Sequence, residues 1–466
     1  MNNTAIISHI KKFTTYEWLL FVKILENTSD EELAKIEPDQ IERYNLQNTN
    51  WYSKLLDLAL RLSDYDTKAI STLPGTNDYK KFISLYLKAY DNESNFKDDL
   101  AYSLDLALSK YTYEQLKYYA PPINDLGRLI ELYSSKEPLF KELFGLTPKQ
   151  ILYFYSLNDQ KHNMYQTFDF SNMLRLLQEY DEKINSAKLK RFLEMFAITI
   201  RDYRLKAKKL GITKRTMKSK RILETYPIII FSDDQYFIPS INVLLATLTY
   251  KIFDVINEQQ NDTQRFKTKF GRTFESYIRK LTKFSHDSYF YECDNLITKA
   301  NEEKAEFYLM KDNSCLVVES KLLHVDEKLI LEGSTKDLDS KFNDTIEKAL
   351  SQLNSCFQKI HVKSKYGIIV IHTHIPLLES FIKLFKYKNK YGFLNNVMII
   401  SVIDYEIIMH NPLNSIIEYF NLPNEQKSLI PLYFGQQNDF LLNSFQNVIE
   451  ELENMIGKRK NQESKN

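Results

Sequence analysis

The sequence predicts a multidomain protein in which an N-terminal all-α region precedes an α/β domain with a mixed sheet flanked by helices. Up to about residue 190, apolar residues recur at i, i+3, i+4 and i+7, the spacing of amphipathic helices. From about residue 265, helical patterns alternate with short apolar strands, as in α/β domains. We therefore expect a helical domain, a basic segment with a β-hairpin and connecting helix, an α/β domain and a C-terminal helical extension, at 1–190, 191–262, 263–410 and 411–466 respectively.

Charge and glycine content exclude several function classes. The chain has 466 residues, with 62 Lys and Arg against 61 Asp and Glu, so no global field favours nucleic acid or membrane. Only 10 glycines are present, and neither GxGxxG nor GxxxxGK[ST] occurs. The phosphate-binding loops of Rossmann and P-loop enzymes are therefore not expected.

Cysteine use and hydropathy indicate a cytoplasmic protein. The three cysteines, Cys293, Cys315 and Cys356, are scattered and odd in number, which disfavours a disulfide framework and a structural zinc site. The N-terminus MNNTAIISHIKK lacks the apolar core of a signal peptide. No apolar run approaches the roughly 20 residues that span a bilayer, so we expect no membrane partner.

The first 190 residues carry helical patterns and no recognisable chemistry. Segments such as "WLLFVKILE", "WYSKLLDLALRLSD" and "FSNMLRLLQEY" are amphipathic, and breakers such as "LPGTND" and "APPIND" separate them. We find no fixed repeat period, so a regular solenoid is not supported. This half is expected to be an interaction or substrate-selection domain.

A basic segment follows, with ten Lys or Arg against the single acid Asp202 between residues 201 and 221. One interpretation is contact with nucleic-acid phosphates, because clustered cations displace counterions from the backbone. The other is a solvated helical face or linker. The candidate contact residues are Arg204, Lys206, Lys208, Lys209, Lys214, Arg215, Lys218, Lys220 and Arg221.

Periodicity then predicts the elements of the C-terminal half. Strands at 226–231 and 236–238 precede a helix from about residue 240. The α/β domain is expected to contain helices at 268–284, 338–362 and 375–387 and strands at 288–294, 304–311, 314–320, 366–372 and 396–402. The last two strands are continuous apolar runs, typical of strands covered on both faces.

The segment "EFYLMKDNSCLVVESKLL" places acids within an apolar hairpin. With a two-residue turn at Asp312 and Asn313, Lys311 opposes Ser314 and Glu306 opposes Glu319, about 5 Å apart at Cβ. Carboxylates at that distance repel each other, and apolar surroundings increase the cost. A shared proton, a neighbouring cation such as Lys321, or a divalent metal would relieve it. Two carboxylates and a backbone carbonyl are hard oxygen ligands suited to Mg²⁺.

This hairpin resembles the metal-binding hairpin of the PD-(D/E)XK nuclease superfamily, whose pattern is an acid on one strand and Glu-x-Lys on the next. The resemblance covers about 265–405 and implies a restriction-endonuclease-like domain with an α-β-β-β-α-β core. It implies that Glu306, Glu319 and the Ser320 carbonyl bind Mg²⁺, with Mn²⁺ able to substitute, and that Lys321 is catalytic.

The same resemblance extends to the flanking helices. "FGRTFESYIRKL" is similar to the preceding helix, where Glu275 would be the acidic residue, and "ALSQLNSCFQKI" is similar to the following helix, where Gln352 would lie near the site. The first acid is usually aspartate, whereas here it is Glu306, which leaves Glu292 and Asp294 as rival ligands.

The implied function is a Mg²⁺-dependent endonuclease with DNA as the expected substrate, in prokaryotic defence against phage or plasmids. It would act as a homodimer or with partner proteins of a defence complex. Two alternatives stay open: an RNase that uses the same site, and an inactive nuclease fold that binds nucleic acid as a scaffold subunit.

Each candidate residue also has a plain structural interpretation. Glu275 could lie on an exposed helix face, Gln352 could be a solvated polar residue, and Lys321 could end an edge strand. The alternate histidines His372 and His374 share a strand face, but no third ligand of matching spacing is nearby, so zinc is not favoured there.

Overall fold

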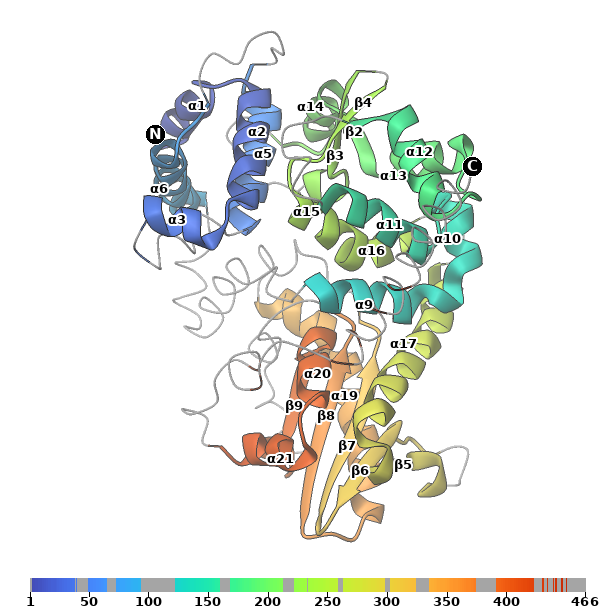
Figure 1. The fold of residues 1–466 in the computed structure, drawn as a ribbon. Coiled ribbons are helices and arrows are strands. Elements are labelled where there is room, and N and C mark those ends of the chain that lie inside the picture. Colours follow the sequence, from blue (N-terminus) through green and yellow to red (C-terminus); the bar gives the residue numbers. More distant parts are fainter. Residues whose placement is uncertain are drawn as a thin grey trace. The chain divides into compact units, whose positions relative to one another are not determined.

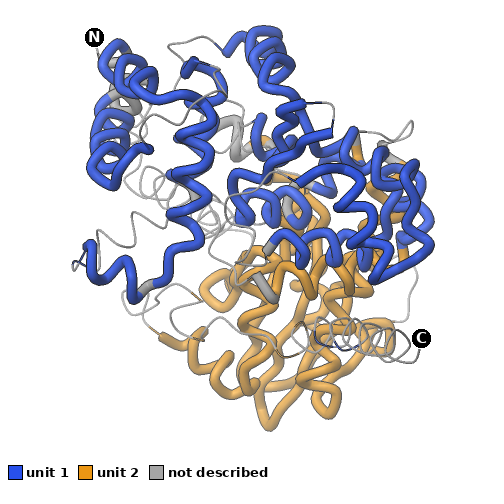
Figure 2. The backbone as a smooth tube through the Cα atoms, turned by 45° about the horizontal axis from the view of Figure 1, so that its top comes forward, with its two compact units in different colours: residues 1–94, 136–256, 446–466 blue, residues 95–135, 257–445 orange. Residues whose placement is uncertain are grey.

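The computed structural model of this chain divides into two compact units (Figure 2). Unit 1 comprises residues 1–94, 136–256 and 446–466, and unit 2 comprises 95–135 and 257–445, so the two interleave along the sequence. The described residues are 2–37, 39, 49–64, 73–93, 122–159, 168–212, 222–232, 234–258, 263–297, 302–323, 335–373, 391–422, 430, 434, 439, 441, 446 and 450.

Unit 1 is mostly helical (Figure 1). Its first helices are α1 (Asn2–Ile10), α2 (Thr15–Asn27), α3 (Asp30–Ile36), α5 (Thr49–Leu62) and α6 (Thr76–Glu93). Further helices are α10 (Glu137–Phe144), α11 (Pro148–Asp159), α12 (Phe170–Tyr180), α13 (Ser186–Phe196), α14 (Ile200–Lys209), α15 (Ile241–Ala246) and α16 (Ile252–Glu258). A π-helical turn, Thr247–Lys251, connects α15 to α16.

A small mixed sheet in the order β1-β4-β3-β2 completes unit 1. Its strands are β1 (Phe168–Asp169), β2 (Ala197–Thr199), β3 (Ile228–Ser232) and β4 (Gln235–Phe237). The expected hairpin is confirmed as β3 and β4, which pair antiparallel. The expectation of an all-α region up to residue 190 is wrong at β1, because a two-residue strand is too short to give a periodic pattern.

The core of unit 1 explains why its helices form. Aromatic side chains from α2, α5 and α6, among them Trp18, Tyr52 and Tyr79, are completely buried. The first turn of α2 is closed by a capping box in which Thr14 and Glu17 each accept the other's backbone N–H. The cap and the buried aromatic side chains therefore both favour helix formation at the places where the sequence is amphipathic.

Unit 2 contains a five-stranded sheet and its covering helices. The strands are β5 (Phe290–Glu292), β6 (Phe307–Lys311), β7 (Ser314–Lys321), β8 (Ser364–Ile371) and β9 (Val397–Ser401). The helices are α9 (Pro122–Tyr133), α17 (Thr263–His286), α19 (Thr335–Lys359), α20 (Val402–Met409) and α21 (Leu413–Asn421). None of these or the other described helices is both long and apolar enough to cross a bilayer.

The sheet of unit 2 has the order β5-β6-β7-β8-β9 and is mixed, because β5, β6 and β7 pair antiparallel whereas β7, β8 and β9 pair parallel. Side chains of β7 alternate between its faces. Cys315 and Val317 pack with residues of α19. The other face meets α17 (Figure 1). Phe270, Phe274 and Ile278 form the buried stripe of that helix.

Two local features fix this packing. The β6–β7 turn is formed by two residues, and Asp312 adopts a left-handed conformation with φ 52° that aspartate tolerates. On β8, a Cβ added at Gly367 would lie 2.9 Å from Leu353 Cδ1 of α19. The missing side chain at Gly367 therefore lets α19 lie close to the sheet.

Most expected elements of unit 2 are confirmed with shifts of a few residues at their ends. The expected helix at 375–387 lies outside the described residues. The described part of the expected C-terminal helical extension contains α21.

Candidate active site

The β6–β7 hairpin brings Glu306 and Glu319 into the same region. The ladder pairs Lys311 with Ser314 and continues to Phe307 opposite Val318, which is the register expected from a two-residue turn. Glu306 lies one residue before β6, and its N–H donates to the Val318 carbonyl at 3.2 Å. The direct opposition expected of Glu306 and Glu319 is therefore not part of the ladder, because the chain leaves regular pairing at Glu306.

At this end of the hairpin, where the backbone ladder has ended, the Glu306 side chain accepts hydrogen bonds from Ser320. Its Oε1 accepts from the Ser320 N–H at 3.1 Å and from the Ser320 hydroxyl. Its Oε2 is buried and has no hydrogen-bond partner in the described structure. Burial, followed by repulsion from Glu319, raises the pKa of Glu306 well above its usual value, although the hydrogen bonds from Ser320 oppose this.

Glu319 is 2% exposed and has a similarly incomplete environment. Its Oε1 accepts from Lys321 Nζ, whereas its Oε2 is buried without a hydrogen-bond partner in the described structure. Burial raises the pKa of Glu319 to about 7, although Lys321 opposes the rise. Each of the two carboxylates thus keeps one buried oxygen without a donor, which is costly unless something else occupies the space.

Gln352 of α19 positions Lys321. Lys321 Nζ donates to Gln352 Oε1 at 2.6 Å, and Gln352 Nε2 donates to the Lys304 carbonyl at 2.8 Å. Glu319 and Lys321 lie on the α19 face of β7, since residues two apart share a face. The helix therefore orients the lysine from one side while Glu319 binds it from the other.

Glu275 lies on α17 close enough to affect both acids. Its negative charge contributes to the raised pKa values of Glu306 and Glu319. Its own carboxylate is 38% exposed and pairs with Arg279 at 3.0 Å. Arg279 also donates to Glu292 of β5 at 3.2 Å.

The rival ligands are engaged elsewhere. Glu292 pairs with Arg279 and with Lys283, and Asp294 is 76% exposed and pairs with Lys304 at 2.7 Å. Neither is among the buried side chains that have an oxygen without a hydrogen-bond partner. The geometry therefore separates them from Glu306 and Glu319.

The donor set fits a hard divalent cation held by few protein ligands. The available oxygens are Glu306 Oε2 and Glu319 Oε2. The Ser320 carbonyl also points toward Glu306, because the N–H and C=O of one strand residue point to the same edge. Across the described ranges, no group of three or more His, Cys, Asp or Glu side chains could hold a metal ion together. Two carboxylates suit Mg²⁺, which commonly keeps several waters.

The cysteines and His372 pack inside unit 2 and are not part of the candidate site. The three cysteines are free and buried, and Cys293 Sγ lies 3.4 Å from Cys356 Sγ, a proximity the sequence did not indicate. The His372 ring contacts Phe270 and Phe274 edge-on. His374 lies outside the described residues.

The basic segment is only partly described. Arg204 donates to the Leu60 carbonyl at 2.9 Å and the Ser63 carbonyl at 2.5 Å, and Lys206 donates to the Tyr226 hydroxyl at 2.5 Å. These two residues therefore contact unit 1 itself. Lys208 and Lys209 are exposed in the last turn of α14, and the remaining candidates, Lys214, Arg215, Lys218, Lys220 and Arg221, lie outside the described residues.

Sequence reasoning missed Arg279 and Lys304 as residues that surround the site. The four-residue spacing of Glu275 and Arg279 on a helix could have indicated the first, whereas the Lys304 carbonyl had no sequence signal. Comparison of the chain with protein-family models, curated proteins and solved structures found no match, so its function has to be inferred from the geometry of this site.

Proposed function

We propose that unit 2 is a Mg²⁺-dependent nuclease of the PD-(D/E)XK type that hydrolyses phosphodiester bonds, with DNA as its substrate. The observation that carries this proposal is the pair of buried carboxylate oxygens without hydrogen-bond donors, on Glu306 and Glu319, beside a positioned lysine. The element order α17, β5, β6, β7, α19, β8 agrees with the α-β-β-β-α-β core of that superfamily.

Each residue has a separate role in this proposal. Glu306 and Glu319 would hold the cation, and Ser320 holds Glu306 in place through its N–H and hydroxyl. When bound, Mg²⁺ polarises the phosphate and lowers the pKa of a coordinated water. Lys321, fixed by Glu319 and Gln352, stabilises negative charge that develops on the phosphate and orients the attacking water.

The cation also explains an otherwise unfavourable arrangement. Burial and repulsion from Glu319 raise the pKa of Glu306, and burial raises that of Glu319. A cation held by these carboxylates would stabilise their charged forms and offset that cost. Lys321 donates to only one of the four carboxylate oxygens, Glu319 Oε1. Ser320 donates to a second, Glu306 Oε1, so the two Oε2 atoms would be left for the cation.

The proposal is tested by incubating the purified chain with circular plasmid and, separately, with single-stranded RNA, with 5 to about 10 mM Mg²⁺ or with EDTA. Nicking or linearisation of plasmid only with Mg²⁺ is expected. Cleavage restricted to RNA would assign the same site to an RNase. Binding of DNA without cleavage under any metal condition would support the scaffold alternative and overturn the nuclease.

A further inference from the structure

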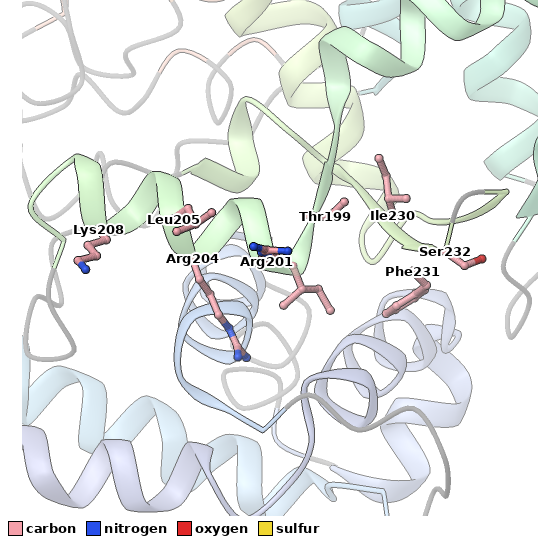
Figure 3. A pocket seen from close by; sticks show the side chains of 9 residues that line it. Thr199, Arg201, Arg204, Leu205, Lys208, Ile230, Phe231 and Ser232 are labelled. Atoms are coloured by element: carbon pink, nitrogen blue, oxygen red, sulfur yellow. The ribbon is translucent and has the colours of Figure 1, made fainter.

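A pocket of about 540 Å³ lies in unit 1, and none of the residues that line it belongs to the proposed nuclease site. It is lined by α14 and by the end of β3, including Arg201, Leu205, Lys208, Ile230 and Phe231 (Figure 3). Its volume is within the range of small-molecule sites, about 300–1,000 Å³.

The sheet topology explains why the pocket forms here. β2 and β3 are parallel, and their pairing ends at Thr199 opposite Ile230. After Thr199 the chain turns directly into α14, with the Thr199 hydroxyl accepting the Asp202 N–H at 3.0 Å, whereas β3 continues to Ser232. The pocket therefore lies beyond the carboxyl ends of two parallel strands, where α/β sheets commonly bind ligands.

Two cations at this pocket have no partner in the described part of the chain. Arg201 and Lys208 are both exposed, and since they are seven residues apart they lie on one face of α14. Arg204, between them, differs because its guanidinium donates to the Leu60 and Ser63 carbonyls. None of the described residues that line the pocket is acidic, so its charge favours an anion.

The remaining wall is apolar. Leu205 is 47% exposed, and Ile230 and Phe231 form the side opposite α14 (Figure 3). An inorganic anion would leave this surface in water. A ligand that combines a phosphate with a flat, weakly polar ring would contact both the cations and the apolar wall.

We propose that this pocket binds a nucleoside phosphate through Arg201 and Lys208, with the base against Leu205 and Phe231. The same chemistry is offered by a free nucleotide and by one nucleotide of a single strand. The site is independent of the metal site and gives unit 1 a ligand-recognition role.

Binding is measured by isothermal titration of the full-length chain in EDTA, so that metal-dependent cleavage has no influence. The probes are ATP, a dT10 oligonucleotide, adenosine and inorganic phosphate. Binding of ATP alone identifies a free nucleotide, and binding of dT10 alone identifies a single strand. Adenosine and phosphate are expected to bind at least about tenfold more weakly than the nucleotide, since each retains only part of the contacts.

Arg201→Gln should weaken binding of the nucleotide about tenfold or more. The matched control is Lys190→Gln, because Lys190 is exposed on α13, lies outside the basic segment and does not line the pocket. Leu205→Ala should weaken ATP but leave inorganic phosphate unchanged. Absence of binding by both ATP and dT10, equal losses for Arg201→Gln and Lys190→Gln, or phosphate binding as tightly as ATP would each overturn the proposal.

Discussion

Gln352 Oε1 accepts a 2.6 Å hydrogen bond from Lys321 Nζ, and this bond joins the middle of α19 to the end of β7. Because Gln352 Nε2 is itself bound to the Lys304 carbonyl, the amide cannot rotate without losing a second hydrogen bond. The lysine is thereby held beside Glu319, which is the arrangement that the proposed chemistry needs.

Replacement of Gln352 by leucine removes the acceptor while keeping a similar volume. We expect Gln352→Leu to lower the rate of plasmid cleavage about tenfold. Gln352→Glu keeps the acceptor for Lys321 but loses the donor to the Lys304 carbonyl, so it should lower the rate less than Gln352→Leu does. Single-turnover cleavage rates measure both. Gln358→Leu, on the exposed side of the same helix, is the control. Equal rates for Gln352→Leu and Gln352→Glu would assign Gln352 a packing role only.

Loss of either buried acid should remove cleavage. Glu319→Gln and Glu306→Gln are each expected to lower the rate by at least about 100-fold, because each removes a charged ligand from the reacting centre. Plasmid nicking assays at saturating Mg²⁺ provide the measurement. Glu303→Gln, which neutralises an exposed acid close by in the chain, should leave the rate unchanged. Wild-type rates in both variants would locate the chemistry elsewhere.

Magnesium should stabilise the folded chain even without substrate. At a concentration tenfold above its dissociation constant, a ligand adds about 1.4 kcal/mol, enough to raise the melting temperature by a few degrees. Thermal unfolding with Mg²⁺ and with EDTA measures this. In Glu306→Gln the increase should vanish, while the EDTA melting temperature should equal or exceed that of the wild type, because a buried charge has been removed. A Mg²⁺-dependent increase that persists in this variant would contradict the assigned ligands.

His286 should make unit 2 sensitive to acid. It is 3% exposed, and burial lowers its pKa from 6.5 to about 4, with Lys311 contributing and a hydrogen bond to Met409 opposing. Between these pH values the unfolded chain binds more protons, so stability falls as the pH drops below 6.5. At 1.36 kcal/mol per pKa unit, the loss by pH 5 is about 2 kcal/mol.

Unfolding of His286→Phe and of the wild type at pH 7.5 and pH 5 tests this expectation. The variant should lose less stability between the two pH values. His361→Phe serves as the control because His361 is exposed. Identical pH dependence in His286→Phe and wild type would mean that another group titrates.

A buried ion pair stabilises unit 2 away from the site. Arg128 binds Glu406 through two hydrogen bonds of 2.6 and 2.7 Å, and Tyr277 donates to the same carboxylate at 2.6 Å. Glu406 is completely buried. Arg128 also pairs with buried Asp125 at 2.9 Å. Arg128→Met should therefore cost about 3–5 kcal/mol of unfolding free energy, since it removes the cation from two buried acids.

Urea unfolding measures this cost, and adding Glu406→Gln to Arg128→Met should recover part of it, because one of the two buried acids that lost their cation is then neutral. Arg175→Met is the matched control. Arg175 pairs with Glu179 on an exposed surface, so its loss should cost less than about 1 kcal/mol. A similar cost for both arginines would show that burial of the Arg128 pair has little energetic effect.

The sequence by itself determined the periodic elements of both units and the register of the β6–β7 hairpin. Helical and strand periods are local properties of amphipathic segments, and the two-residue turn at Asp312 sets the pairing of every residue up to Phe307. The same local reasoning selected Glu306, Glu319 and Lys321. It failed for β1 and β2, whose two or three residues are too few to establish a period.

Only the tertiary structure decided which of these residues meet and what surrounds them. The bond from Lys321 to Gln352 spans 31 positions, and the pocket beside α14 requires β2 and β3 to pair in parallel across a long stretch of chain. That α9 belongs to unit 2 is also a matter of packing between distant segments, since it contacts α17. Side-chain burial and partners depend on contacts between residues far apart in sequence, and periodicity carries no information about them.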